Sequence, residues 1–303
     1  LELLKNMLTT QENNSSFISF FKQEVTNSSL KNSTKRNHLS TLMLLQEFKK
    51  DITFSDLTFE FVSSFEYFLQ LKGYHTNTIA KHMKHLKRHV NIAINKEYIE
   101  IQKYAFRKYK IKTVENKHTH LVPEELEKLE KLNLSGRYMK LQKSLDAFLF
   151  CCYAGMRYSD FTNLSSENIV DINQETWLIY KSVKTGTEVR LPLYLLFAGK
   201  GIIILNKYRD NLEGFFRLRD NSNVNKDLLT LAKLAGLSKN ISFHTARHTN
   251  ATLLIYNGVS ITTVQKLLGH KSVKTTQVYT NIMDMTIIHD LEKMKQATPF
   301  AGK

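Results

Sequence analysis

Proline is rare in this chain, and that scarcity constrains its fold more than any other feature. Only Pro123, Pro192 and Pro299 occur in 303 residues, together with 11 glycines. Proline and glycine interrupt or end helices, so long stretches without them favour helical structure. We therefore expect a mainly α-helical protein in which a small antiparallel sheet is the exception.

The first hundred residues predict about four helices. Apolar residues recur there at helical spacing, over residues 17–25, about 34–50, 58–71 and 76 to about 97. Ser15 or Ser16 can cap the first helix, and Ser33 or Thr34 the second. Gly73 ends the third helix in the way that is usual for helix C-termini.

The helix expected from residue 76 has two faces of different character. One apolar stripe consists of Ile79, Met83, Leu86, Val90 and Ala93. A different face carries Lys81, Lys84, Lys87 and Arg88, with His82, His85 and His89 among them. A basic face opposite a core face suits a helix that lies along a DNA backbone. A solvated lysine face, common on surface helices, is the alternative.

The chain is expected to form two domains. Residues 1–102 form a helical domain, 103–117 a basic linker that can itself lie on phosphates, and 118–303 a second domain. In the linker Tyr104 and Tyr109 can stack on bases or pack against protein. The candidate DNA-contacting cations are Lys35, Arg36, Lys81, Lys84, Lys87, Arg88, Arg107, Lys108 and Lys110.

The second domain is expected to be helical with one small sheet. Pro123 opens a helix, and a further helix over 138–154 stops at Gly155. Three short strands follow within 167–192, with Lys184 in the turn of a hairpin between the last two. Helices then return, at about 223–235, 244–256, 260–268, 272–280 and 284–294.

The net charge points to a polyanionic partner. Lys and Arg number 43 and Asp and Glu 28, a net charge of +15. Residues 1–117 hold 19 basic and 11 acidic side chains and the remainder 24 and 17, so both halves are basic. Nucleic acid is the commonest partner of such a surface; a merely basic protein without such a partner is the alternative.

Other sequence features argue against membranes, metals and cofactors. No apolar run approaches a membrane helix, and no signal peptide opens the chain, so we expect a cytoplasmic protein. The basic charge of both halves adds the expectation that it associates with the nucleoid. Cys151 and Cys152 are adjacent in an apolar run, which favours buried, inert thiols over a disulfide. With no other cysteine and no carboxylate cluster, we expect no metal and no cofactor.

Six dispersed residues carry the chemistry, although each alone is weak. In order they are Arg157, Lys184, His244, Arg247, His270 and Tyr279. Arginine forks bind phosphate oxygens, and His244 and Arg247, three apart, share a helix face. Taken singly, Arg157 is explained equally well by a salt bridge to Asp160, Lys184 by a solvated turn position and Tyr279 by a place in the core.

The set of six, with its spacings, resembles the tyrosine recombinases of the phage-integrase type. His270 precedes Tyr279 by nine residues, and Arg157 precedes His244 by 87. The motifs are GMRYSD, the lysine of VKTG, HTARH, LLGHKS and TTQVYTN. The resemblance covers the whole chain, because the basic helical first domain looks like the core-binding domain of that family.

The resemblance implies a role for each residue. Tyr279 would be the nucleophile that forms a 3′-phosphotyrosyl link, and Lys184 the general acid for the departing 5′-oxygen. Arg157 and Arg247 would hold the non-bridging oxygens, and His270 would stabilise the transition state. His244 would act as an acid/base or orienting group, with Asp160 and His248 in support.

The resemblance also implies double-stranded DNA as substrate and self-association on it. Integration or excision of a mobile element is the expected function; chromosome-dimer resolution, a type IB topoisomerase-like activity and simple DNA binding are alternatives. An amphipathic helix at 283–294 would dock on a neighbouring protomer or on its own domain, and a DNA-bending accessory protein is a further possible partner. Because the chain starts at Leu1, we expect a fragment that lacks an upstream arm-binding domain.

Overall fold

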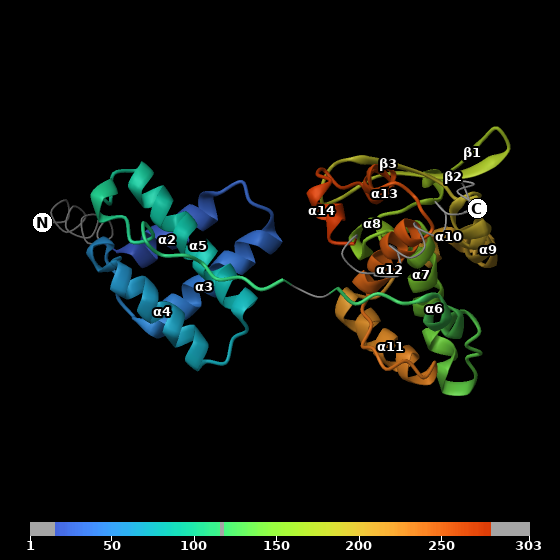
Figure 1. The fold of residues 1–303 in the computed structure, drawn as a ribbon, viewed down its shortest axis with the longest axis horizontal. Helices are drawn as coiled ribbons and strands as arrows, with labels where there is room; N and C mark the ends of the chain where they lie inside the picture. Colours follow the sequence, from blue (N-terminus) through green and yellow to red (C-terminus); the bar gives the residue numbers. More distant parts are fainter. Residues whose placement is uncertain (1–15, 116–117, 280–303) are drawn as a thin grey trace, which may run out of the picture. The chain divides into compact units, whose positions relative to one another are not determined.

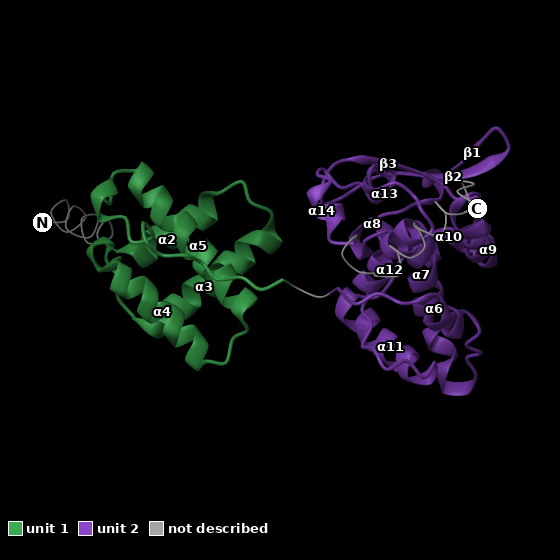
Figure 2. Ribbon diagram, in the orientation of Figure 1, with its two compact units in different colours: residues 1–116 green, residues 117–303 purple. Residues whose placement is uncertain are grey.

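The computed structural model describes residues 16–115 and 118–279, and the chain divides into two compact units (Figure 2). Unit 1 spans Leu1–Asn116 and unit 2 spans Lys117–Lys303. Each unit has a hydrophobic core of its own. None of the helices in the described ranges is long and apolar enough to cross a membrane.

Unit 1 is all-helical, as expected. Its helices are α2 (Phe17–Asn27), α3 (Asn32–Phe48), α4 (Phe59–Leu71) and α5 (Thr76–Asn95) (Figure 1). Ser16 caps α2 by accepting a hydrogen bond from the Ser19 N–H, and Thr58 caps α4. The cap expected for α3 is wrong: α3 begins two or three residues earlier, after Lys31, without a side-chain cap.

The apolar stripe of α5 is the centre of the unit 1 core. Ile79, Met83, Leu86, Val90 and Ala93 are all buried, as the sequence predicts. The interleaved histidines do not share the basic face, however. His82 and His89 are buried, because positions next to the stripe face α3 rather than solvent.

A cluster of four histidines closes the seam between α3 and α5. His38 Nδ1 lies 3.1 Å from His89 Nε2, and Thr41 Oγ1 lies 2.8 Å from the Nδ1 atoms of both His82 and His85. Burial, with Lys81 or Arg88 nearby, lowers the pKa of His82 and His85 to about 4 and that of His89 to about 3. These rings are therefore neutral at pH 7.

Acidification is expected to loosen unit 1. Depressed histidine pKa values mean that the unfolded chain binds protons first, so stability is present above about pH 6.5 and falls as the pH drops toward 4. The slope is roughly 1.4 kcal/mol per pH unit for each histidine that stays neutral when folded. Amide hydrogen exchange of α3 and α5, corrected for intrinsic rates, should accelerate between pH 7.5 and 5.5.

Two variants make this prediction specific. His89→Phe keeps a ring against Phe21, whose centroid is 3.7 Å away, and should weaken the pH dependence by removing one titrating group. His75→Gln, at the exposed N-terminal end of α5, should leave it unchanged. Equal pH dependence in wild type and His89→Phe would contradict the claim that protonation of His89 contributes to the loss of stability at low pH.

The segment expected to be a linker belongs in large part to unit 1. Ala105 and Phe106 are buried in its core, and Tyr109 packs edge-on against Phe106 at 5.5 Å. Further along, the Asn77 amide donates to the Val114 carbonyl and accepts from the Val114 N–H. The boundary between units therefore lies near residue 116, because the apolar residues in this charged stretch are enough to anchor it.

Unit 2 is mainly helical with one three-stranded antiparallel sheet, as expected. Its helices are α6 (Pro123–Glu130), α7 (Gln142–Ala154), α8 (Tyr158–Phe161), α9 (Lys200–Lys207), α10 (Leu212–Phe216), α11 (Asn221–Leu234), α12 (Phe243–Tyr256), α13 (Ile261–Leu268) and α14 (Lys274–Gln277). Its strands are β1 (Ile169–Ile172), β2 (Glu175–Lys181) and β3 (Glu188–Pro192), paired in that order. Sequence analysis missed the short helices α8, α9 and α10, and the helix expected at 284–294 lies outside the described residues.

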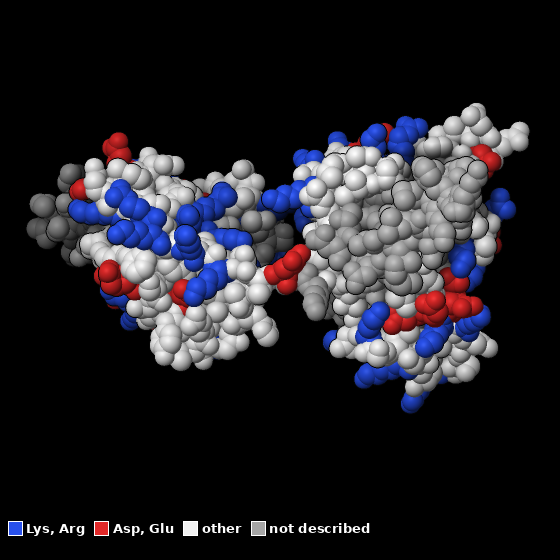
Figure 3. All heavy atoms as spheres, in the orientation of Figure 1, with Lys and Arg blue, Asp and Glu red and all other residues white. Residues whose placement is uncertain are grey.

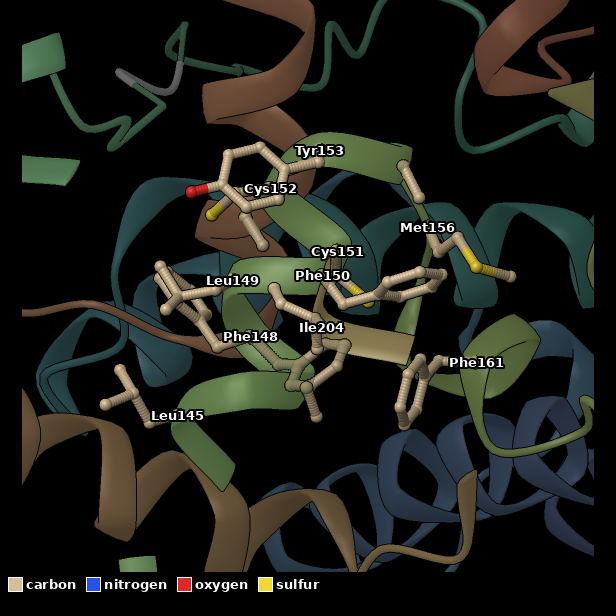
Figure 4. Close-up of a cluster of buried hydrophobic side chains, with 14 of the residues drawn as sticks. Leu145, Phe148, Leu149, Phe150, Cys151, Cys152, Tyr153, Met156, Phe161 and Ile204 are labelled. Carbon is tan, nitrogen blue, oxygen red and sulfur yellow. The ribbon is translucent and has the colours of Figure 1, made fainter. Parts of the chain in front are cut away.

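Helix α7 is the central element of unit 2. Every residue from Ser144 to Ala154 is buried, because α12, α9, α11 and α10 cover it on several sides. Figure 4 shows side chains of this core, in which Phe150 of α7 packs against Phe161 with ring centroids 5.9 Å apart. Cys151 and Cys152 are free thiols in this core, as predicted. Burial raises the pKa of both thiols, which makes them inert.

Candidate active site

A left-handed glycine ends α7 and places Arg157 at the site. Gly155 has φ 66°, and a Cβ there would lie 2.6 Å from Asn250 Oδ1. Only glycine therefore lets the chain pass this close to α12. Two residues later Arg157 Nη1 lies 3.4 Å from Asp160 Oδ2 and 3.2 Å from Ser182 Oγ.

Asp160 connects Arg157 to the β2–β3 hairpin. Its carboxylate is almost fully buried and accepts a hydrogen bond from the Val183 N–H at 2.9 Å. Ser182 Oγ also donates to it. Asp160 thus holds both an arginine and the base of the turn that carries Lys184. Ser182 was not expected from the sequence, where nothing distinguishes a serine at the end of a strand.

Arg247 is the most deeply buried cation of the described residues. It is 1% exposed, and its guanidinium donates to the Gly155 carbonyl at 2.7 Å and the Leu268 carbonyl at 2.6 Å. Burial, and then the charge of Arg157, lower the pKa of Arg247 to about 10, so it remains charged at pH 7. The two guanidinium groups repel each other, so an anion bound between them would be stabilised by both charges.

The loop after α13 brings His270 beside the hairpin turn. Gly269 ends α13 with φ 62°, and a Cβ there would lie 2.6 Å from Val189 of β3. Thr185 Oγ1 donates to the Gly269 carbonyl at 3.3 Å, which ties the Lys184 turn to this loop. His270 Nδ1 lies 2.9 Å from Thr276 Oγ1, which fixes the ring.

Tyr279 lies in the same site with its hydroxyl held by a histidine. The side chain is 5% exposed, and its Oη lies 3.1 Å from His248 Nδ1. Burial raises the pKa of Tyr279, whereas the charges of Arg247 and Arg157 act to lower it. The two arginines are therefore close enough to stabilise a phenolate.

The histidines of the site are neutral. Burial and the arginine charges lower the pKa of His270 to about 3. Burial and the neighbouring His244 lower that of His248 to about 3. His244 is exposed at the surface, yet partial desolvation and the nearby charges of Arg247, Arg157 and Lys184 lower its pKa to about 4. The positive charge thus resides on two arginines and a lysine, with neutral imidazoles as hydrogen-bonding groups between them.

The structure places all six residues of the sequence motif near one another. Lys184 is exposed in the β2–β3 turn, and its charge acts on His244 and His270. The six residues come from four separated segments: the start of α8, the β2–β3 turn, α12 and the stretch from α13 to Tyr279. Sequence analysis missed Ser182, Thr185 and Thr276. The Ser182 hydroxyl hydrogen-bonds with Arg157 and Asp160, that of Thr185 with the Gly269 carbonyl and that of Thr276 with His270. Among the described residues no group of three or more His, Cys, Asp and Glu side chains is arranged to hold a metal ion.

The expected DNA-contacting cations of unit 1 are mostly at its surface. Lys and Arg side chains gather on the face of unit 1 that is visible in Figure 3. Along α5 a shallow open depression of ≈ 400 Å³ is lined by Lys84, Lys87, Arg88 and Asn91, among others. Arg36, Lys81, Arg107, Lys108 and Lys110 are also exposed. Lys35 differs, since its ammonium donates to the Thr26 carbonyl at 2.7 Å.

Comparison with known proteins identifies the family. Residues 120–285 match the phage integrase family, and residues 16–111 match the phage integrase SAM-like domain. The chain belongs to the phage integrase family of tyrosine recombinases. The two matches fall on units 2 and 1 respectively.

Curated relatives agree with this family. The chain is 26% identical over 271 residues to tyrosine recombinase XerD of Oceanobacillus iheyensis, which covers 82% of this chain and 86% of the relative. It is 31% identical over 185 residues to a tyrosine recombinase of Pseudothermotoga lettingae, covering 58% of this chain and 60% of that relative.

Two DNA-bound structures share the fold of this tyrosine recombinase. A lambda integrase dimer bound to a COC′ core site matches with a TM-score of 0.71 at 19% identity, covering 87% of this chain and 93% of that one. The Tn1549 transposon integrase in complex with transposon right end DNA matches with a TM-score of 0.70 at 17% identity, covering 92% and 99%.

Proposed function

We propose that this tyrosine recombinase cuts and rejoins double-stranded DNA at specific sites through a 3′-phosphotyrosyl intermediate on Tyr279. The observation that carries the proposal is the Tyr279 hydroxyl, held by His248 in a site that also contains Arg157 and Arg247. A buried phenol near two arginines suits attack on a phosphodiester, because the arginines can bind its negatively charged oxygens.

Each step of the reaction has a group to perform it. The Tyr279 oxygen forms a bond to phosphorus while the bond from phosphorus to the 5′-oxygen breaks. Arg157, Arg247 and His270 stabilise the charge that builds on the non-bridging oxygens. The Lys184 ammonium gives its proton to the departing 5′-oxygen. The hydroxyl proton of Tyr279 passes to a neighbouring base, and His248 Nδ1 and His244 are available for that transfer or for orienting the groups.

The energetics require no further reagent. The phosphotyrosyl link conserves the energy of the phosphodiester, so rejoining by a 5′-hydroxyl needs no nucleotide triphosphate. The cationic side chains supply charge that a metal ion provides in other phosphoryl-transfer sites.

A nicked suicide substrate tests the reaction directly. A duplex carrying a cognate recombination site would be incubated with the protein in EDTA, and covalent complexes would be separated on a denaturing gel. We expect a protein–DNA band whose peptide map places the DNA on Tyr279. Absence of any adduct on cognate sites, or a map that places the DNA on another residue, would refute the proposal.

The proposed biological role is integration or excision of a mobile genetic element. The lysine- and asparagine-rich first unit favours it over chromosome-dimer resolution. The relatives include both kinds, since XerD is among the sequences and a transposon integrase among the structures. Recombination between element ends and a chromosomal target supports the proposal, whereas exchange confined to a chromosomal resolution site favours the alternative. Relaxation of plasmid without exchange would favour a topoisomerase-like enzyme.

Self-association on DNA belongs to the same proposal. The helix expected at 283–294 is its candidate contact, and it lies outside the described residues. Solved relatives include a lambda integrase dimer on a core site and a tetramer on a Holliday junction. A DNA-bending accessory protein remains an expected partner of the assembled complex.

The basic face of α5 is proposed to contact DNA phosphates. Replacing Lys84 and Arg88 together with Gln should weaken DNA binding and reduce the slope of log affinity against log salt by about 2, since each phosphate contact contributes about 1. Fluorescence anisotropy over a salt series measures both quantities. Lys72→Gln is the matched control, because Lys72 is already paired with Glu47. An unchanged slope in the double variant would contradict this contact.

A further inference from the structure

His118 makes a contact that none of the sequence motifs anticipates. Its ring stacks on the ring of His248, with centroids 4.5 Å apart and planes 28° apart. His248 is also the residue whose Nδ1 lies 3.1 Å from the Tyr279 hydroxyl. His118 is thus one residue removed from the atom that is proposed to attack DNA.

The backbone beside His118 is anchored to α12, so the stack is not a loose surface contact. The Leu121 N–H donates to Oγ1 of Thr249, the residue that follows His248, at 2.9 Å. Leu121 itself is fully buried. The Lys239 ammonium donates to the His120 carbonyl at 3.2 Å and to Glu125 at the start of α6. Two separate anchors therefore hold the segment that presents His118.

The ring of His248 is enclosed by different groups in different directions. His118 lies parallel to it, whereas His244 approaches edge-on at 4.5 Å and 81°. The Tyr279 ring lies 5.5 Å from it. The torsion that turns an imidazole about its bond to Cβ has broad minima, so packing decides which nitrogen faces a partner. A stacked neighbour restricts that rotation, because a turned ring would collide with it.

We propose that His118 is a positioning residue for strand cleavage: by stacking on His248 it holds His248 Nδ1 against the Tyr279 hydroxyl. This inference rests on the proposed function, in which Tyr279 is the nucleophile. His118 itself does not contact Tyr279 or the DNA in this account. Its contribution passes through the hydrogen bond that orients the hydroxyl.

Single-turnover cleavage of the suicide substrate at saturating DNA tests the role. His118→Ala should slow adduct formation about tenfold, the effect of losing roughly one well-placed hydrogen bond. DNA affinity should stay within about twofold, because the loss falls on the chemical step. His118→Phe, which retains a flat ring, should recover most of the rate. Thr119→Ala, exposed in the same segment, is the matched control and should behave as wild type.

A double-mutant cycle separates positioning from general packing. If His118 acts through His248, then His118→Ala should cause no further loss in a His248→Ala background. An equal loss in both backgrounds would overturn the proposal. So would a wild-type rate in His118→Ala, or a rate in His118→Phe as low as that in His118→Ala.

A measurement without DNA keeps this inference distinct from the proposed function. In protein labelled with ¹⁵N-histidine, the shifts of His248 report its tautomer and hydrogen bonding. We expect them to change in His118→Ala and to return toward wild type in His118→Phe. If wild type forms no adduct, the proposed function fails while these shifts still decide whether His118 orients His248. Identical spectra in all three proteins would overturn the inference.

Discussion

Tyr279→Phe is expected to abolish covalent linkage to DNA while leaving DNA binding intact. The substitution removes only the hydroxyl, which hydrogen-bonds to His248. Because the variant lacks the proposed nucleophile, the loss should reach at least roughly 10⁴-fold, as for other covalent nucleophiles. Denaturing gels of the suicide-substrate reaction measure it, and anisotropy on an intact duplex measures affinity.

Tyr180→Phe is the matched control for this prediction. Tyr180 is also 5% exposed and lies near Arg247 and Arg157, but its hydroxyl has no hydrogen-bond partner among the described residues. Removing a buried, unpaired hydroxyl is expected to be neutral or slightly stabilising. Adduct formation should therefore survive in Tyr180→Phe. Loss in that variant with retention in Tyr279→Phe would reverse the assignment of the nucleophile.

The stability of Tyr279→Phe should change little. One hydrogen bond to a neutral histidine contributes about 1 kcal/mol, and the phenyl ring still fills its buried position. Urea unfolding should therefore show a shift of about that size, too small to explain a missing adduct. A larger loss of stability would mean that the hydroxyl has a structural role which the activity assay cannot separate.

The sequence predicted the elements that periodicity and glycine punctuation encode. The apolar stripe of α5, the Ser16 cap and the stops at Gly73 and Gly155 all follow from local rules. The six motif residues were also found, although their gathering in one site depended on a family resemblance. Nothing in the local sequence around Arg157 or Tyr279 shows that they meet.

The failures have physical causes. Histidine occurs both at surfaces and in cores, so the sequence does not predict that His82 and His89 are buried. Their burial depends on the packing of α3 against them. The basic composition of residues 103–117 led to the prediction of a linker. Burial of Ala105 and Phe106 in the core is enough to attach this stretch to unit 1. Contacts such as the His118–His248 stack join residues 130 positions apart, and only tertiary structure specifies them.

The electrostatics of the site fit its proposed substrate. The charge of Arg157 helps to lower the pKa of Arg247, and the neighbouring imidazoles stay neutral. Bringing in a phosphodiester would replace this repulsion with attraction. The repulsion in the free site therefore favours binding of an anion. The transition state carries more negative charge on its oxygens than the bound substrate, so the site stabilises it more strongly.

Arg247→Lys is expected to reduce cleavage by about 10²–10³-fold, although it keeps the charge. Two guanidinium nitrogens of Arg247 already donate to the Gly155 and Leu268 carbonyls, and the remaining N–H groups are available to a phosphate. A lysine ammonium has one nitrogen and cannot reach both carbonyls and the phosphate at once. Single-turnover cleavage at saturating DNA measures the loss, with exposed Arg190→Lys on β3 as control.

The same variant should also lose stability, and the two effects can be separated. A buried carbonyl left without a donor costs about 1–3 kcal/mol, so the unfolding midpoint should fall. Cleavage is therefore compared at a temperature where the variant is shown to be folded, with its DNA affinity measured alongside. A rate within about threefold of wild type under those conditions would mean that charge alone suffices. The fork geometry of Arg247, and with it the assignment of this residue to the non-bridging oxygens, would then be wrong.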